Sequence, residues 1–273
     1  MPDGMTLDMQ SVQGTMLLPL WGRAKYSEEN PDILDDQMAI RIIRNIGIDF
    51  SEIAKSFGEY GGLSYIIRAR AFDNAVRLFI KTHPRATVVN IGAGLDTTFS
   101  RVDNGSILWY NLDLPDAIRY RQSLIPDSTR NTCISKSLFD VSWFDEIVFN
   151  KEDGILFISA GVLYYFKEED IREIVLKMIQ RFPGGELFFD AETKRAVAVS
   201  NKMVKKTGNK GAVMYFYINN EQKLRKWSPS IRKVSSEPFF KGIPRKKKWH
   251  FKTRFFMTMT DAVNMVKYVR IKF

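Results

Sequence analysis

The residues with the clearest capacity for chemistry lie in the segment VVNIGAGLDTTFSR, positions 88–101. A β-branched run leads directly into Gly92-Ala93-Gly94, where the backbone can approach a ligand without Cβ atoms in the way and can present amides at the start of a helix. A dinucleotide-binding turn would place a third glycine at position 97, but Thr97 stands there, and the sequence contains no Gly-Lys-Ser/Thr phosphate loop. The turn therefore predicts a cofactor that carries a ribose but no phosphates.

A carboxylate at the end of the next apolar run supports a ribose. In LWYNLDLPDA, Asp113 follows the first glycine by about twenty residues, the spacing at which a carboxylate accepts hydrogen bonds from both ribose hydroxyls. Asp113, followed by Leu114, is the principal binding candidate, whereas Asp96 is expected to fix the glycine turn. The alternative is that the Gly-x-Gly is only a tight strand-to-helix connection.

Short apolar runs around this turn predict a parallel sheet. Five strand-like segments occur in the order TVVNIG, ILWYNLD, NTCIS, GILFISAGV and GELFFDA, and the amphipathic helix KEEDIREIVLKMIQRF separates the last two. Strands joined by helical or looped connections of this length are typical of an α/β fold with helices on both faces of the sheet. A further alternating segment, residues 268–273, predicts a C-terminal strand.

Helical segments flank this core. Apolar residues recur at helical spacing in 35–46 and in 64–81, and residues 194–238, rich in Lys and aromatics, are typical of a helical cover inserted late in the chain. We therefore expect one domain over residues 1–273. It divides into a helical N-terminal cap (1–83), a cofactor-binding core (84–193), a substrate-cover insertion (194–240) and C-terminal strands (241–273).

The amino-acid composition argues against several classes of protein, among them proteins with an internal disulfide and membrane-spanning proteins. Of the 273 residues, 45% are hydrophobic, which is enough for a full core. One cysteine, Cys133, and two histidines exclude an internal disulfide and a thiolate metal cluster, so no metal site is expected. The mixed, acidic start lacks the pattern of a signal peptide, and the longest weakly polar run is too short to span a bilayer. These features predict a cytoplasmic protein without a membrane span.

Positive charge is concentrated in one region. The chain has a net charge of +10, and residues 201–254 hold 16 Lys and Arg against two acids. The density peaks at PRKKKWHFKTR (244–254), which interleaves Lys and Arg with Trp249 and Phe251. Such a region predicts contact with nucleic acid, anionic lipid or an acidic small substrate. The alternative is a solvated basic face that aids solubility.

Four stretches together resemble the signatures of a known family. They are LLPLWGRAKYS, IIRARAFDN, VVNIGAGLDTTFSR with YNLDLPDAIRYR, and SLFDVSWFDEI followed by SAGVLYYF. On these residues nearly the whole chain resembles the leucine carboxyl methyltransferase-like branch of class I S-adenosylmethionine-dependent methyltransferases, including the polyketide O-methyltransferases of that branch. The resemblance implies a Rossmann-like sheet, mostly parallel with an antiparallel C-terminal strand, a helical N-terminal arm, a late helical insertion, and S-adenosylmethionine as cofactor.

The resemblance also implies roles for individual residues. The turn from Gly92 to Gly94 would line the methionine moiety of the cofactor, and Asp113 its ribose. Arg68 would pair with the carboxylate of the cofactor, an anion that suits a guanidinium fork. Arg70 lies on another helical face and is the second candidate for this pairing.

Two positions depart from the pattern of the family. Ser137-Leu138 stands where relatives usually have an Asp-Leu pair against the adenine, and Asp140 is the candidate substitute. Ala160 stands where relatives carry a glutamate, which predicts either looser cofactor binding or a protein that has lost catalysis. Tyr165, after the same predicted strand, is expected on the substrate side.

Methyl transfer from a sulfonium needs little from the protein. The leaving group is already activated and a carboxylate acceptor is ionised near neutral pH, so positioning supplies most of the acceleration and the sequence names no catalytic residue. A phenol or enol acceptor would require a base or a positive field.

The sequence therefore predicts an O-methyltransferase that acts on a carboxylate or hydroxyl of a small acidic or polyketide-like metabolite, with residues 194–254 closing over it. One alternative is a nucleic-acid methyltransferase that uses the basic 202–254 region and stacks bases on Trp249 or Phe251. The other is a non-catalytic cofactor-binding homologue. The sequence does not predict the oligomeric state.

Overall fold

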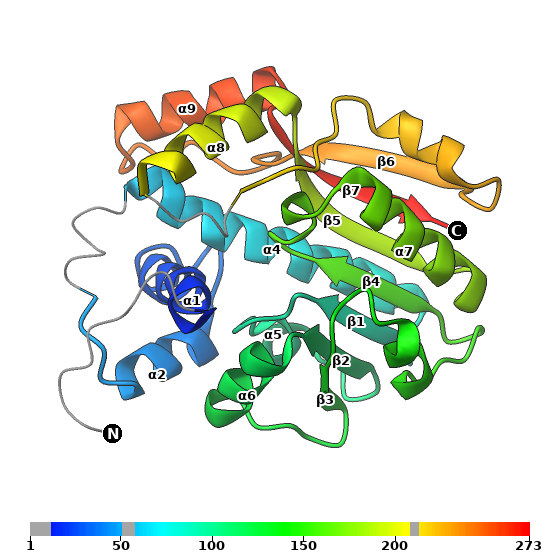
Figure 1. The fold of residues 1–273 in the computed structure, drawn as a ribbon. Helices are drawn as coiled ribbons and strands as arrows, with labels where there is room; N and C mark the ends of the chain where they lie inside the picture. Colours follow the sequence, from blue (N-terminus) through cyan, green and yellow to red (C-terminus); the bar gives the residue numbers. More distant parts are fainter. Residues whose placement is uncertain (1–11, 51–57, 208–212) are drawn as a thin grey trace.

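The computed structural model describes residues 12–50, 58–207 and 213–273. Within these residues the chain forms a seven-stranded sheet with helices on both faces (Figure 1). The strands are β1 (Thr87–Ile91), β2 (Leu108–Asp113), β3 (Asn131–Ser135), β4 (Ile155–Ser159), β5 (Glu186–Glu192), β6 (Lys233–Pro238) and β7 (Val266–Lys272). The α-helices are α1 (Val12–Glu29), α2 (Gln37–Asn45), α4 (Glu59–Thr82), α5 (Thr98–Val102), α6 (Pro115–Leu124), α7 (Glu168–Arg181), α8 (Lys194–Thr207) and α9 (Phe251–Ala262). Short 3-10 helices are η1 (Val141–Glu146), η2 (Leu163–Tyr165) and η4 (Glu221–Trp227).

The order of the strands across the sheet is β3-β2-β1-β4-β5-β7-β6. Strands β1 to β5 pair in parallel, and β7 pairs antiparallel with both β5 and β6. The five strands expected from the sequence appear in the expected order, and the C-terminal strand begins slightly earlier than expected, at Val266. The prediction of a mostly parallel sheet with an antiparallel C-terminal strand is confirmed.

The two central strands, β1 and β4, mark the edge of the sheet at which a ligand is expected to bind. Strands β1 (TVVNI) and β4 (ILFIS) are buried at every position, as expected for parallel strands covered on both faces. Because β2 and β3 lie on one side of β1 and β4 and β5 on the other, the strand order reverses between β1 and β4. In open α/β sheets, ligands bind at such a switch point, beyond the carboxyl ends of the strands. The glycine turn follows β1 at this edge.

Two apolar clusters hold helices to the sheet. On one face, α7 packs through residues such as Ile174 and Met178, and its first turn carries three acids that favour the N-terminal end of a helix. On the opposite face, α4 packs against the strands through residues such as Phe72 and Val76. The longest described helix, α4, therefore supports the whole centre of the sheet and carries Arg68 toward its carboxyl edge.

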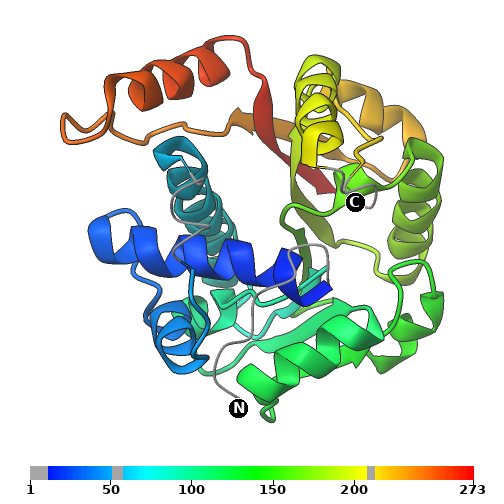
Figure 2. The ribbon, with the colours of Figure 1, turned by 60° about the vertical axis from the view of Figure 1, so that its left-hand side comes forward.

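Helices α1 and α2 form a cap beside the carboxyl ends of the parallel strands (Figures 1 and 2). Leu20 and Trp21 of α1 pack with Ala39 of α2 and with Leu95, which directly follows the glycine turn. The apolar segment MLLPLW therefore belongs to a helix that covers this edge, and Pro19 lies inside that helix.

A buried carboxylate joins the cap to the core. Asp36 accepts hydrogen bonds from Ala39 N (3.1 Å), which caps α2, and from Thr97 Oγ1 (2.6 Å), and it forms ion pairs with Arg23 (3.1 Å) and Arg101 (2.8 Å). Burial alone would raise the pKa of Asp36, but Arg101 and Arg23 outweigh it and hold the pKa below its usual value.

Three boundaries differ from the expectations above. Helix α4 begins at Glu59, earlier than the expected start at residue 64. The range 194–240, expected to be helical, also contains β6, and the range 241–273, expected to hold strands, also contains α9. Strand β6 (KVSSEP) escapes recognition because it is an edge strand with little apolar alternation, and α9 because its large apolar residues point outward.

Residues 1–11 and 51–57 of the predicted cap, and residues 208–212 of the predicted insertion and basic region, lie outside the described residues. Where the structure describes the chain, its helices are too short or too polar to cross a bilayer.

Candidate active site

A cavity of about 980 Å³ opens at the carboxyl edge of the parallel strands, beside the glycine turn. Its wall comes from α1, α4, the turn after β1, the end of β2, the segment after β4, the end of β5 and Met214. This volume lies near the top of the range of about 300–1,000 Å³ that is typical of small-molecule sites. The cavity therefore has room for a cofactor and a second small molecule.

Most of the site residues predicted from the sequence meet at this cavity. Those that line it are Arg68, Gly92, Ala93, Gly94, Asp113, Leu114, Ala160 and Tyr165. Ser137, Leu138 and Asp140 lie outside its lining. Leu138 is part of the apolar core, and Asp140 accepts hydrogen bonds from the backbone (3.1 Å) and hydroxyl (2.7 Å) of Ser142 at the start of η1. Leu138 and Asp140 thus have local structural roles, and a contact of Ser137, Leu138 or Asp140 with the adenine stays a prediction.

Asp113 lies directly under the glycine turn. Its two oxygens accept hydrogen bonds from Gly94 N (2.8 Å) and Leu114 N (2.7 Å). Burial raises the pKa of Asp113, while these two amides act in the opposite direction. Each carboxylate oxygen has a second acceptor position, so the side chain can hold the turn and still accept hydrogen bonds from two ribose hydroxyls.

The first glycine of the turn is required by packing. Gly92 has φ +65°, a region that side chains disfavour, and a Cβ atom there would lie 2.5 Å from Cγ2 of Val162. The segment after β4 can therefore pack directly on the turn, which brings Ala160 and Val162 into the same cavity wall.

Two buried arginines fix the turn from behind. Arg121 of α6 donates through Nη1 to the carbonyls of Gly94 (2.9 Å) and Asp96 (2.7 Å), and Arg23 of α1 donates through Nη2 to the carbonyl of Leu95 (2.7 Å). Sequence reasoning gave neither arginine a role. Both, however, lie in segments that carry the family resemblance, LLPLWGRAKYS and YNLDLPDAIRYR.

The side chain of Asp96 also holds the turn. It accepts hydrogen bonds from Asn90 Nδ2 (2.8 Å) and Thr98 Oγ1 (3.0 Å). This agrees with the expectation that Asp96 fixes the glycine turn. Because these donors occupy both of its oxygens, the carboxylate is preorganised as part of the wall.

Arg68 presents a guanidinium to the cavity from α4. Its Nε lies 3.2 Å from Asp190 Oδ2 but is buried without a hydrogen-bond partner in the described part of the chain, so the pair is ionic. A Cβ atom on Gly161 would lie 2.7 Å from Arg68 Nη1, so the guanidinium packs against bare backbone. Burial alone would lower the pKa of Arg68. The Asp190 carboxylate outweighs this effect and holds the pKa above its usual value. Arg68 therefore stays charged and has donors to offer an anion.

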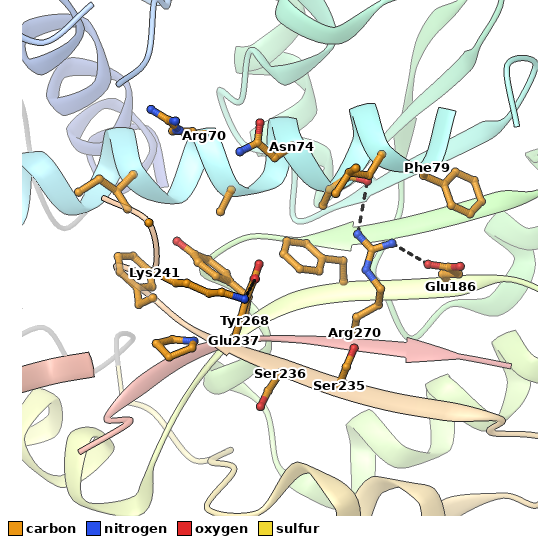
Figure 3. A pocket seen from close by; sticks show the side chains of 18 of the residues that line it. Arg70, Asn74, Phe79, Glu186, Ser235, Ser236, Glu237, Lys241, Tyr268 and Arg270 are labelled. Atoms are coloured by element: carbon orange, nitrogen blue, oxygen red, sulfur yellow. Dashed lines mark hydrogen bonds and ion pairs between the residues drawn. The ribbon is translucent and has the colours of Figure 1, made fainter. Parts of the chain in front are cut away.

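Arg70 lies elsewhere. It donates through Nη1 to the carbonyls of Asp32 (3.1 Å) and Ile33 (3.5 Å) and lines a second cavity, of about 830 Å³, between α4 and strands β5, β7 and β6 (Figure 3). In that cavity Arg270 pairs with Glu186 at 2.7 Å. Of the two arginine candidates, the structure thus places only Arg68 at the glycine turn.

The end of β5 supplies two further acids. Asp190 is buried and accepts a hydrogen bond from Gly161 N (2.6 Å), and Glu192 lines the cavity and accepts one from Ser200 Oγ (3.1 Å) on α8. Burial raises the pKa of Glu192, and neighbouring Asp190 raises it further, against the effect of Ser200. Sequence reasoning missed both acids. The available signal was that they close the apolar strand GELFFDAE at the same edge as the glycine turn.

The late insertion borders the cavity through Met214, in the part of the chain that the structure describes. Tyr215 N and Phe216 N donate to the carbonyl of Tyr164 (2.7 and 3.2 Å), and Asn201 forms two hydrogen bonds of 2.8 Å with the backbone of Met214. Tyr165, which is 36% exposed, lines the cavity with its ring 4.8 Å from that of Tyr164, and its place on the substrate side stays a prediction. The wall opposite the glycine turn is therefore aromatic and polar.

The basic region is less open than the sequence indicated. Trp249 is only 4% exposed, and its Nε1 donates to Asn30 Oδ1 (3.1 Å). The expectation that Trp249 stacks on bases is therefore wrong, whereas Phe251 is 72% exposed. Among the described residues, His, Cys, Asp and Glu do not gather into a group that could hold a metal ion.

The lining suits S-adenosylmethionine. The partly unsatisfied Arg68 matches its carboxylate, the glycine turn leaves space for its amino-acid portion, and Asp113 matches its ribose. Glu192 at the end of β5 and the tyrosines Tyr164 and Tyr165 after β4 line the same cavity.

Comparisons with known proteins agree with this site. The sequence profile of the leucine carboxyl methyltransferase family matches residues 17–179. The chain is 27% identical to the tetracenomycin polyketide synthesis O-methyltransferase TcmP of Streptomyces glaucescens, over 90% of this chain and 92% of TcmP. It is 22% identical to the S-adenosyl-L-methionine-dependent methyltransferase dpfgK of Gibberella zeae, over 84% of each chain.

The fold is similar to that of a Thermobifida fusca crystal structure assigned as a methyltransferase. The TM-score is 0.62 at 11% identity, and the match covers 97% of this chain and 96% of the other. The family profile, the strand order and the cavity at the switch point thus agree. The chain belongs to the leucine carboxyl methyltransferase family and is an S-adenosylmethionine-dependent methyltransferase.

Proposed function

We propose that the protein transfers a methyl group to an oxygen, a carboxylate or a hydroxyl, of a small aromatic or polyketide-like metabolite. The observation that carries this proposal is the space beside the glycine turn, walled by Tyr164, Tyr165 and Glu192 and closed by the late insertion. The 27% identity to TcmP, a polyketide O-methyltransferase, supports the same class of acceptor.

Positioning carries most of the catalysis. When bound, S-adenosylmethionine supplies a methyl group on a sulfur that is already an activated leaving group. Arg68 holds the carboxylate end and Asp113 holds the ribose, while Met214 of the insertion and Tyr165 border the same cavity. Alignment of two reactants in this way accounts for about 7–11 kcal/mol of a barrier, so a dedicated catalytic triad is unnecessary.

The acceptor oxygen decides whether a base is needed. A carboxylate is ionised near neutral pH and reacts without one. A phenol or enol must lose its proton, and Glu192, whose pKa is raised by burial, is the group on the acceptor wall that can take it.

A turnover assay with S-[methyl-³H]adenosylmethionine tests the proposal. The enzyme is incubated with a small-molecule extract and with a panel of hydroxylated and carboxylated polyketides, and the products are treated with mild alkali. A methyl ester releases labelled methanol, whereas a methyl ether retains the label, so the chemistry of the acceptor is read directly. The variant Asp113→Asn serves as the inactive control.

The alternatives predict other outcomes. Label that nuclease treatment releases from nucleic acid would contradict the proposal and support the use of the basic 202–254 region. Binding of S-adenosylmethionine without transfer to any extract component would contradict it in favour of a non-catalytic homologue. Label on nitrogen, identified by fragmentation of the product, would contradict the assignment to oxygen.

A further inference from the structure

Helix α9 carries an apolar face that the described residues leave uncovered. The exposed fractions are 72% for Phe251, 51% for Phe255, 53% for Phe256, 43% for Met259 and 55% for Val263, just after the helix. At about 100° per residue, these side chains fall within an arc of about 140°. The helix buries the opposite side, through Thr253, Met257 and Thr260. Large exposed apolar patches of this kind mark contact surfaces.

The orientation of α9 is fixed by its buried side. Thr260 Oγ1 hydrogen-bonds to Tyr60 OH on α4 (3.0 Å). Asp261 accepts from Phe240 N (2.9 Å) and pairs with Arg245 (2.9 Å). Figure 2 shows the helix at the periphery of the molecule. The outward direction of the phenylalanines is therefore part of the folded structure.

The charge around this face is positive. Lys247 and Lys248 lie shortly before Phe251, where the helix begins, and Lys252 falls within the same arc as the phenylalanines. Lys247 and Lys252 are exposed and have no acidic partner in the part of the chain that the structure describes. The single acid of α9, Asp261, is neutralised by Arg245. The face therefore combines apolar rings with uncompensated lysines.

We propose that α9 docks this face on the surface of a bilayer that contains anionic lipid. Helices that lie in the membrane interface combine exposed Phe with Lys, so that the rings enter the acyl boundary while the ammonium groups stay among the headgroups. Anionic headgroups complement the lysines. An acidic protein would match the charge, but phenylalanines interleaved with Lys252 match a lipid interface better.

Docking through α9 would bring the membrane surface to the edge of the sheet at which the cavity opens. The helix leads into β7, and Val266 at the start of β7 pairs with Glu192 at the end of β5. Glu192 lines the cavity, so the docking face and the active site share one edge of the sheet (Figure 1). A lipid-soluble acceptor would reach the cavity from the membrane surface. The docking itself does not depend on the nature of the acceptor.

Vesicle co-sedimentation of the full chain tests the proposal. Vesicles of phosphatidylcholine with phosphatidylglycerol are compared with vesicles of phosphatidylcholine alone. We expect the protein to sediment with the anionic vesicles, and the double variants Phe251→Ser/Phe255→Ser and Lys247→Glu/Lys252→Glu to reduce partitioning by about tenfold or more. Added salt should weaken binding. The matched controls are Val148→Ser, an equally exposed apolar residue elsewhere, and Lys151→Glu.

Circular dichroism and the affinity for S-adenosylhomocysteine confirm that the variants keep their fold. The proposal is overturned if the wild-type chain stays in the supernatant with anionic vesicles, or if the helix variants partition as the wild type does. It is also overturned if sedimentation velocity shows a dimer that Phe251→Ser/Phe255→Ser converts to monomer, because the face would then belong to a second copy. Failure of methyl transfer in solution would leave these partition results unaffected.

Discussion

Replacement of Arg68 by glutamine should separate cofactor recognition from stability. The substitution removes the guanidinium that faces the cavity. Among the described residues it leaves Asp190, whose side chain is 2% exposed, with the amide of Gly161 as its hydrogen-bond donor. We therefore expect two effects: weaker binding of the cofactor carboxylate, and an unpaired buried charge on Asp190.

The magnitudes follow from the contacts. A charge-assisted hydrogen bond contributes about 1.5–3 kcal/mol, so the affinity for S-adenosylhomocysteine should fall by about 10- to 150-fold. The unpaired Asp190 should cost about 3–5 kcal/mol of unfolding free energy. In the double variant Arg68→Gln/Asp190→Asn the buried charge is absent, so stability should largely recover while the affinity stays low.

Isothermal titration with two ligands is the assay. S-adenosylhomocysteine carries the carboxylate, whereas 5′-methylthioadenosine lacks the amino-acid portion. We expect Arg68→Gln to weaken the first ligand and to leave the second unchanged. Arg70→Gln, on the same helix but bonded to the carbonyls of Asp32 and Ile33, should affect neither. Equal losses for both ligands, or no loss for either, would refute the assignment of Arg68.

Three other outcomes follow from the structure. Asp36→Asn should lower the unfolding free energy by about 3–5 kcal/mol, because buried Arg23 loses its paired carboxylate and Arg101 loses one of the two carboxylates with which it pairs, the other being Asp73. The exposed neighbour Asp35→Asn should change little. Chemical denaturation compares the two variants, and equal effects would contradict the network. Gly92→Ala should destabilise the protein by about 1–3 kcal/mol, since its Cβ would lie 2.5 Å from Val162 at φ +65°, and an unchanged melting temperature would count against this packing. Burial raises the pKa of the Cys133 thiol to about 12. Because the thiolate is the reactive form, iodoacetamide at pH 8.5 should alkylate Cys133 about a thousandfold more slowly than free cysteine. Alkylation at the rate of free cysteine would contradict this burial.

The sequence was sufficient for the sheet and the glycine turn because both depend on local pattern. β1 and β4 are short, mostly apolar runs, and Asp113 closes β2 at a fixed distance from the turn. Pairing of β1 with β2 then brings Gly94 N to 2.8 Å from Asp113. Neighbouring parallel strands make such a meeting predictable, because their carboxyl ends share one edge.

The rest depends on contacts between distant segments. Helical periodicity separates Arg68 from Arg70, but only the packing of α4 decides which one faces the turn. Trp249 lies among lysines, yet it pairs with Asn30, which is 219 residues away, so its burial has no local signal. Asp190 and Glu192 come to lie near the cavity only because β5 pairs with β4 in the folded sheet. Ser137 and Leu138 lie outside the cavity lining, and the adenine contact expected there stays a prediction.

The central claim is that the carboxylate at position 113 and the turn above it hold S-adenosylmethionine. Titration of S-adenosylhomocysteine into the wild type, Asp113→Asn and Asp116→Asn tests it, since Asp116 is exposed and pairs with Arg119 on the same helix. We predict binding to the wild type and to Asp116→Asn, and affinity at least about tenfold lower for Asp113→Asn, which loses the charge and one acceptor. Absence of binding to the wild type at millimolar ligand, or equal affinities for all three proteins, would contradict the claim.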